Sequence, residues 1–218
     1  MSSKNTFSEK MIKRAKEKTP GRGWHSSAYH KHFEDYAEYE RTDGKGRTRI
    51  QRVYVGTWYI QELSRGRAIL VRALLGALWC AAAVLFVLAS SRNVPANSRW
   101  FTAAAQFVGV LLMTWTLTGM ANYFTVGTKM TVGDLNCGVK RFRRGCVYSA
   151  AVLWLLTSDY ALCAFLIEEG IAAHLLCAGI SAAAALALLL AWRLDANIPV
   201  REEKSSPESA PADAVQIE

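Results

Sequence analysis

Residues 68–90 read AILVRALLGALWCAAAVLFVLAS, a run in which Arg72 is the one charged residue. An α-helix needs about 20 apolar residues to cross the roughly 30 Å hydrocarbon core of a bilayer. Arg72 stands near the start of the run, where a long side chain can reach back to the lipid headgroups. The run therefore predicts a transmembrane helix.

Three further apolar runs follow, at 100–124, 146–167 and 171–192. Each meets the same length criterion. Pro95 breaks the chain between the first two runs, and Gly170 separates the last two. We therefore expect an α-helical membrane protein built as a four-transmembrane-helix bundle.

The segments on either side of the predicted bundle (68–192) are polar. Residues 1–67 are basic, whereas residues 193–218 are rich in Pro, Ser, Ala and acidic side chains, a composition typical of a disordered tail. The mean hydropathy of +0.09 is thus an average over apolar and polar segments. A soluble all-helical protein remains the alternative interpretation of the four runs.

Lysine and arginine are unevenly distributed among the segments that flank the runs. Sixteen lie in the segment ending at Arg72 and five in the connection 125–145, whereas the connection 91–99 holds two and 168–170 holds none. Cytoplasmic loops hold the excess of Lys and Arg. We therefore expect both termini in the cytoplasm and the bundle in the plasma (inner) membrane, with anionic lipid headgroups rather than nucleic acid as the partner of the net charge of +8.

The basic N-terminal region has a pattern of its own. Residues 7–18 are typical of a short basic amphipathic helix, which can lie on a membrane surface. Residues 36–61 predict a β-hairpin, because the turn sequence DGKG at 43–46 is followed by β-branched and aromatic residues. The second strand begins with three arginines that are candidate contacts for lipid or a partner: Arg47, Arg49 and Arg52.

The connection 125–145 is long for a link between two helices. Its four glycines, at positions 127, 133, 138 and 145, suggest turns. A basic cluster next to a membrane span is an expected contact for anionic lipid, although it can also serve as a topology signal without a specific ligand. The candidate contacts in this cluster are Lys140, Arg141, Arg143 and Arg144.

Asp159 is the most unusual residue of the predicted spans, because an ionisable group within a membrane is costly. Possible partners are His174 on the fourth span and Gln106 on the second. Such a set can form a path for protons or cations. The alternative is that Asp159 is protonated, or hydrogen-bonded to a neighbouring helix, with a structural role.

Small residues that are spaced four apart allow helices to approach closely in lipid. Span four contains the pairs Gly179 with Ala183 and Ala178 with Ala182, and span one contains Ala73 with Ala77 and Ala77 with Ala81. These pairs predict packing faces within the chain or, alternatively, the interface of a homo-oligomer.

Motifs of enzymes and metal sites are missing from the sequence. Neither HExxH nor GxSxG occurs, and His25, His30 and His32 lack a second cluster of ligands. The five cysteines do not have a spacing typical of a zinc site or a disulfide framework. The sequence therefore predicts neither an enzyme nor a bound metal or cofactor.

Two functions from different classes fit these observations. The first is a non-enzymatic scaffold or accessory subunit that docks a cytoplasmic partner or anionic lipid through its basic N-terminal region. The second is a small ion or solute transporter, or a channel component, that uses Asp159 inside the membrane.

Overall fold

The computed structural model describes residues 36–42, 48–167, 170–204 and 215–216. The chain divides into two compact units. The first comprises residues 1–57 together with 204–218, and the second comprises residues 58–203. Each unit is described by itself.

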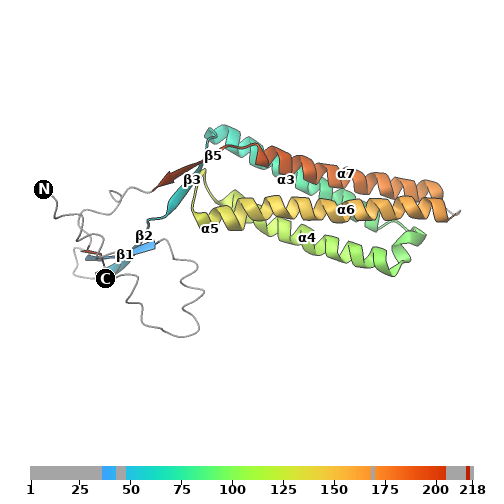
Figure 1. Ribbon diagram of the computed structural model, residues 1–218, viewed down its shortest axis with the longest axis horizontal. Coiled ribbons are helices and arrows are strands. Elements are labelled where there is room, and N and C mark those ends of the chain that lie inside the picture. The colour runs from blue at the N-terminus through green and yellow to red at the C-terminus, as the bar shows by residue number, and fades with distance from the viewer. Residues whose placement is uncertain (1–35, 43–47, 168–169, 205–214, 217–218) are drawn as a thin grey trace, which may run out of the picture. The chain divides into compact units, whose positions relative to one another are not determined.

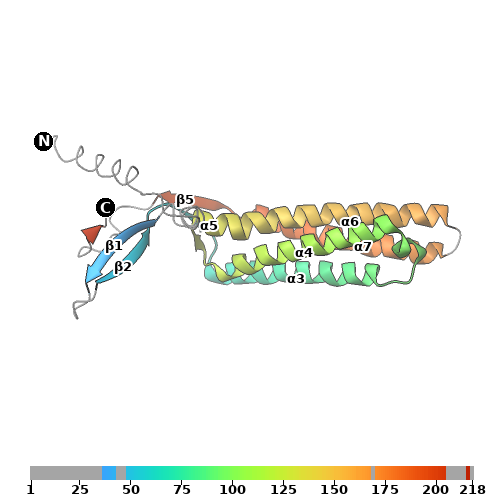
Figure 2. The same ribbon diagram turned by 90° about the horizontal axis from the view of Figure 1, so that it is seen from below.

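The second unit is built on four helices of 26 residues each: α3 (Arg65–Ser90), α4 (Trp100–Thr125), α6 (Arg141–Leu166) and α7 (Ile171–Ala196). At 1.5 Å per residue each helix is about 39 Å long, which exceeds the hydrocarbon core. All four are long and apolar enough to cross a membrane, as the sequence predicted. They run alongside one another as a bundle (Figures 1 and 2).

The helices do not pack in chain order. Helix α7 packs against both α3 and α6, and α4 packs mainly against α6. The sequential pair α3 and α4 has few backbone contacts and meets through aromatic side chains instead. A Cβ atom added at Gly109 of α4 would lie 3.0 Å from the ring of Phe86 on α3, and one at Gly76 would lie 3.3 Å from the ring of Phe124.

Helices α3, α6 and α7 extend beyond the apolar runs that predicted them, and α6 begins at Arg141 rather than at 146. Helix α3 begins at Arg65 rather than at 68, because the Ser64 side chain caps its first turn by accepting a hydrogen bond from the Arg67 backbone N–H. Helix α7 continues past 192 to Ala196. Its last turn holds the buried Asp195, whose contacts are described below.

The connection expected as a loop is largely helical. After β4 (Lys129–Met130), the chain forms α5 (Val132–Asp134) and a π-helical segment η2 (Leu135–Lys140) that leads directly into α6. Thr131 and Asp134 start this helical stretch with a capping box, since each side chain accepts a hydrogen bond from the other's backbone N–H.

The interpretation of Gly138 and Gly145 as turn residues is wrong, because both lie in helical backbone packed tightly on α4. A Cβ atom at Gly145 would lie 2.4 Å from Thr116 Oγ1, and one at Gly138 would lie 3.1 Å from the backbone nitrogen of Tyr123. These glycines are needed for close approach of two helices. A pattern of glycines alone does not distinguish this role from a turn.

One end of the bundle carries a small sheet of strand order β4-β3-β5. Strand β3 (Thr57–Gln61) pairs antiparallel with β4, with Tyr59 opposite Met130. The third strand, β5 (Val200–Lys204), lies in the segment expected as a disordered tail, so that expectation does not hold for residues 193–204. We call the end of the bundle where α3 and α6 begin the strand end, and the opposite end the far end.

The first unit contains a second sheet, of strand order β2-β1-β6. Strand β1 (Tyr36–Thr42) pairs antiparallel with β2 (Thr48–Tyr54), and β6 (Val215–Gln216) pairs with β1. The predicted helix 7–18 and the DGKG turn lie outside the described residues. The predicted hairpin with its turn therefore stays a prediction.

The outer surface of the bundle is apolar. More than half of the side-chain surface is exposed at Val84 on α3, Leu111 on α4, Leu155 on α6 and Leu186 on α7. A soluble protein rarely exposes apolar surface on this scale, whereas lipid chains solvate it without cost. The surface is thus compatible with a membrane location, and it disfavours the soluble alternative.

Most of the small-residue pairs do not form the packing faces between helices that were expected of them. Gly179 and Ala183 on α7, and Ala73 and Ala77 on α3, are all exposed. A Cβ atom at Gly179 would have no heavy atom within 4 Å. The interpretation as internal packing faces is therefore wrong for these two pairs and for Ala77 with Ala81. Ala178 is buried and Ala182 is half-buried, so that pair does face the bundle interior.

Candidate functional site

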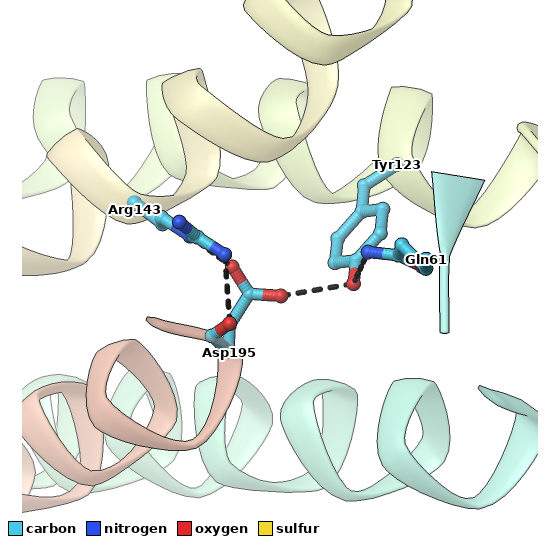
Figure 3. Close-up of polar contacts among 4 residues, drawn as sticks. All are labelled: Gln61, Tyr123, Arg143 and Asp195. Carbon is cyan, nitrogen blue, oxygen red and sulfur yellow. Dashed lines mark hydrogen bonds and ion pairs between the residues drawn. The ribbon is translucent and has the colours of Figure 1, made fainter. Parts of the chain in front are cut away.

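A buried polar cluster lies at the strand end of the bundle, and we call it the strand-end cluster. Gln61 Nε2 donates a hydrogen bond to the Tyr123 hydroxyl at 2.8 Å, and this hydroxyl donates to Asp195 Oδ1 at 2.9 Å. Figure 3 shows Tyr123 and Arg143 approaching the Asp195 carboxylate from different sides. The four residues come from β3, α4, α6 and α7, so the cluster joins four separate elements.

Arg143 and Asp195 form the ion pair at the centre of this cluster. Arg143 Nε donates to Asp195 Oδ2 at 2.5 Å, and Arg143 Nη2 donates to the Asp195 backbone carbonyl at 2.7 Å. The Asp195 side chain is fully buried, and that of Arg143 is 28% exposed. Charge-assisted hydrogen bonds of this kind are about twice as strong as neutral ones. The pair therefore ties the end of α7 to the start of α6.

Arg72 extends the cluster toward α3. Its guanidinium carbon lies 5.3 Å from the centre of the Tyr123 ring, a cation–π distance, and its Nη2 donates to the Gly127 carbonyl at 3.0 Å. The side chain thus reaches toward the strand end, in agreement with its expected position at the edge of the membrane core.

The Tyr123 hydroxyl and both Asp195 carboxylate oxygens are occupied by protein groups. Such a set of internal contacts holds the elements in place. The strand-end cluster is therefore organised as a structural joint.

A second polar cluster lies at the far end. Asn97, in the short 3₁₀ helix η1 (Pro95–Ser98), donates from Nδ2 to the backbone carbonyls of Ala89, Ser90 and Arg92, and so closes the end of α3. Its Oδ1 accepts hydrogen bonds from Tyr160 at 2.6 Å and Gln106 at 2.9 Å.

Asp159 lies in α6 near this cluster and is 7% exposed. Its Oδ2 accepts a hydrogen bond from Thr102 Oγ1 on α4 at 2.7 Å, and the Cys163 thiol lies 3.7 Å from Oδ1. The carboxyl group is thus hydrogen-bonded to a neighbouring helix and does not face lipid.

Among the described residues, no hydrogen bond joins the three residues that the sequence grouped as an intramembrane site. Gln106 donates to Asn97 and Tyr160, not to Asp159. His174 on α7 is fully buried, and neither of its ring nitrogens has a hydrogen-bond partner among the described residues. In the part of the chain that the structure describes, no hydrogen bond or ion pair joins His174 to Asp159.

The basic cluster that precedes span three lies where η2 meets α6. Lys140 and Arg144 are exposed, Arg141 is half-buried, and Arg143 is paired with Asp195. Three of the four are thus accessible for a lipid or a partner.

The remaining candidate contacts belong to the first unit. Arg47 lies outside the described residues, and Arg49 and Arg52 lie on β2 opposite Arg41 and Glu38 of β1. Their part in binding stays a prediction.

Sequence reasoning missed six residues of the two clusters and of the surroundings of Asp159: Gln61, Asn97, Thr102, Tyr123, Tyr160 and Asp195. For Asp195 a signal was present, because it is an acidic residue just past the fourth apolar run, on the same predicted side as the basic cluster. An acidic residue there is the natural partner for one of the four cations. Gln61 and Thr102 are ordinary polar residues, and no feature of the sequence marks them.

Within residues 36–42, 48–167, 170–204 and 215–216, no group of three His, Cys, Asp or Glu side chains is arranged to hold a metal ion. The cysteines at positions 80, 137, 146, 163 and 177 are free thiols, and the last three are buried.

The protein is thus of the class of helical proteins with four candidate membrane spans, and a polar cluster lies at each end of its bundle. No family model, curated protein or solved structure matches the chain.

Proposed function

We propose that the protein is a non-enzymatic membrane scaffold or accessory subunit, which docks a cytoplasmic partner or anionic lipid through its basic N-terminal region. The observation that supports this most is the strand-end cluster. Through Gln61 it fastens β3, the strand that follows the N-terminal region, to α4 and α7. This buried joint holds β3, the strand through which the N-terminal region connects to the bundle.

The distribution of charge supports the orientation that this proposal needs. The basic N-terminal segment and the segment after α7 connect to the helices at the strand end, where the basic cluster around Arg144 also lies. The connections at the far end hold few cations. By the positive-inside rule the strand end faces the cytoplasm. The plasma (inner) membrane is the proposed location.

Partner capture tests the scaffold function. We expect that replacing residues 36–53 with a Gly-Ser linker of equal length will remove a partner that the intact chain retains in detergent. The linker spares β3 and Gln61, so the strand-end cluster remains intact. The measurement is quantitative mass spectrometry after affinity capture from the native membrane.

The matched control is Asp159→Asn, which changes the bundle and leaves the N-terminal region untouched. It should retain the partner at the wild-type ratio. An identical set of captured proteins with and without residues 36–53 would contradict the scaffold function.

The second candidate is an ion or solute carrier that uses Asp159. It is favoured by one observation, namely that the bundle interior holds polar groups that the described residues do not satisfy. His174 Nδ1 and Nε2 and Ser181 Oγ are buried without a hydrogen-bond partner in the part of the chain that the structure describes. Buried groups of this kind normally bind water or an ion.

Flux measurements test the carrier. If Asp159 conducts protons or cations, Asp159→Asn should abolish flux in proteoliposomes with an imposed gradient, because an amide cannot exchange a proton or pair with a cation. The amide oxygen can still accept the hydrogen bond from Thr102, so folding should be kept. Ser158→Ala is the control, since Ser158 is the exposed neighbour of Asp159. Equal flux through both variants, or none through the wild type, excludes the carrier.

A further inference from the structure

A pocket opens at the strand end, between the first two turns of α3 and the chain that follows α4. Its wall includes Arg65, Ile69 and Arg72 from α3 and the residues Gly127 and Thr128. The α3 residues recur at intervals of four and three, which places them on one face of the helix. The cavity volume is about 420 Å³, within the range of roughly 300–1,000 Å³ that is usual for small-molecule sites.

The pocket is positively charged. Arg65 and Arg72 line it, and none of the residues in its wall is acidic. Arg72 uses Nη2 to donate to the Gly127 carbonyl and its Nε is buried, whereas Arg65 is exposed. A guanidinium has five N–H donors in a fixed plane, which match the oxygens of a phosphate group. The site thus has donors to offer to an anion.

The same pocket has an apolar side. Ile69 lines it and is 62% exposed, and the adjacent Leu70 is 69% exposed. Both lie in a helix that is apolar enough to span a membrane. A free anion does not need this surface, whereas a molecule with a charged head and a hydrocarbon chain uses both parts.

We propose that this pocket binds the phosphate of an anionic phospholipid. The phosphate oxygens accept hydrogen bonds from Arg65 and Arg72, and an acyl chain lies along Ile69 on the outer face of α3. The proposal rests on the membrane placement in the proposed function, but not on the docking of a protein partner. It also differs from the exposed basic cluster at Lys140 and Arg144, because it assigns one lipid to one defined cavity.

Arg65→Gln is the central variant of the test. Arg65 is exposed and its loss should not disturb folding, which a melting temperature verifies. Arg67→Gln is the matched control, because Arg67 is equally exposed in the same turn but does not line the pocket. Native mass spectrometry of the full chain in detergent, titrated with phosphatidylglycerol, measures the affinity of the tightest bound lipid. Loss of one charged hydrogen bond predicts about tenfold weaker binding for Arg65→Gln and roughly unchanged binding for Arg67→Gln.

Competition distinguishes the two possible sources of phosphate. Inorganic phosphate at millimolar concentration should not displace the lipid, because it lacks the acyl chain. Displacement would show a site for soluble phosphate and overturn the proposal. Equal weakening by Arg65→Gln and Arg67→Gln would show diffuse surface charge, and it would overturn the proposal as well. Since Arg65→Gln leaves residues 36–53 intact, unchanged partner capture with reduced lipid binding separates this site from the scaffold function.

Discussion

Replacing Arg143 with alanine is expected to lower the free energy of unfolding by about 3–5 kcal/mol. The variant leaves the Asp195 carboxylate fully buried without its ion-pair partner, and it also removes the hydrogen bond to the Asp195 backbone carbonyl. Desolvation of an uncompensated charge, rather than the loss of attraction alone, accounts for most of the cost. Reversible unfolding in mixed detergent micelles measures the change.

Arg144→Ala is the matched control, because the residue is adjacent, identical in type and exposed. Its expected change lies within about 0.5 kcal/mol. Adding Asp195→Asn to Arg143→Ala should recover part of the lost stability, since the double variant no longer buries a charge. Equal effects of Arg143→Ala and Arg144→Ala would show that the buried ion pair does not hold α6 and α7 together.

The second large effect concerns the contact between α4 and α6. Gly145→Ala should cost about 1–3 kcal/mol, the usual penalty for overpacking a tight interior. The new methyl group would lie 2.4 Å from Thr116 Oγ1 and 3.0 Å from Thr116 Cα, so the helix backbones must separate. The same unfolding assay measures this loss.

Gly179→Ala provides the comparison for Gly145→Ala within the same bundle. The added methyl group meets no heavy atom within 4 Å, and alanine favours a helix by up to about 1 kcal/mol over glycine. Stability should therefore be unchanged or higher. If both substitutions destabilise the protein equally, Gly145 is not required for the close packing of α6 on α4.

The spans were predictable because their signal is long and simple. A run such as 68–90 has a length and composition that only a membrane helix needs, and all four runs correspond to helices. The connection 125–145 was harder, since Gly138 and Gly145 have the same local pattern whether they form turns or admit a neighbouring helix. The difference depends on residues of α4 that are distant in sequence.

In the polar clusters, too, the sequence indicates some residues, whereas others are identified only by the folded structure. Asp159 was recognisable by its cost in an apolar run, but its partner Thr102 was not, because a threonine in a span usually bonds its own helix backbone. Arg143 was recognised as a cation and assigned to lipid, whereas it belongs to Asp195. Sequence thus located the charges, and the packing of α6 on α4 and on α7 decided their partners.

The order of packing has a consequence for biogenesis. Helices α3 and α4 are synthesised first, yet α3 packs mainly against α7 and α4 against α6. During synthesis, therefore, the first two helices exist before the neighbours that complete their interior. Asn97 in the turn of this hairpin also accepts a hydrogen bond from Tyr160 of the third span. The complete packing of the bundle can therefore form only after α7 has been synthesised.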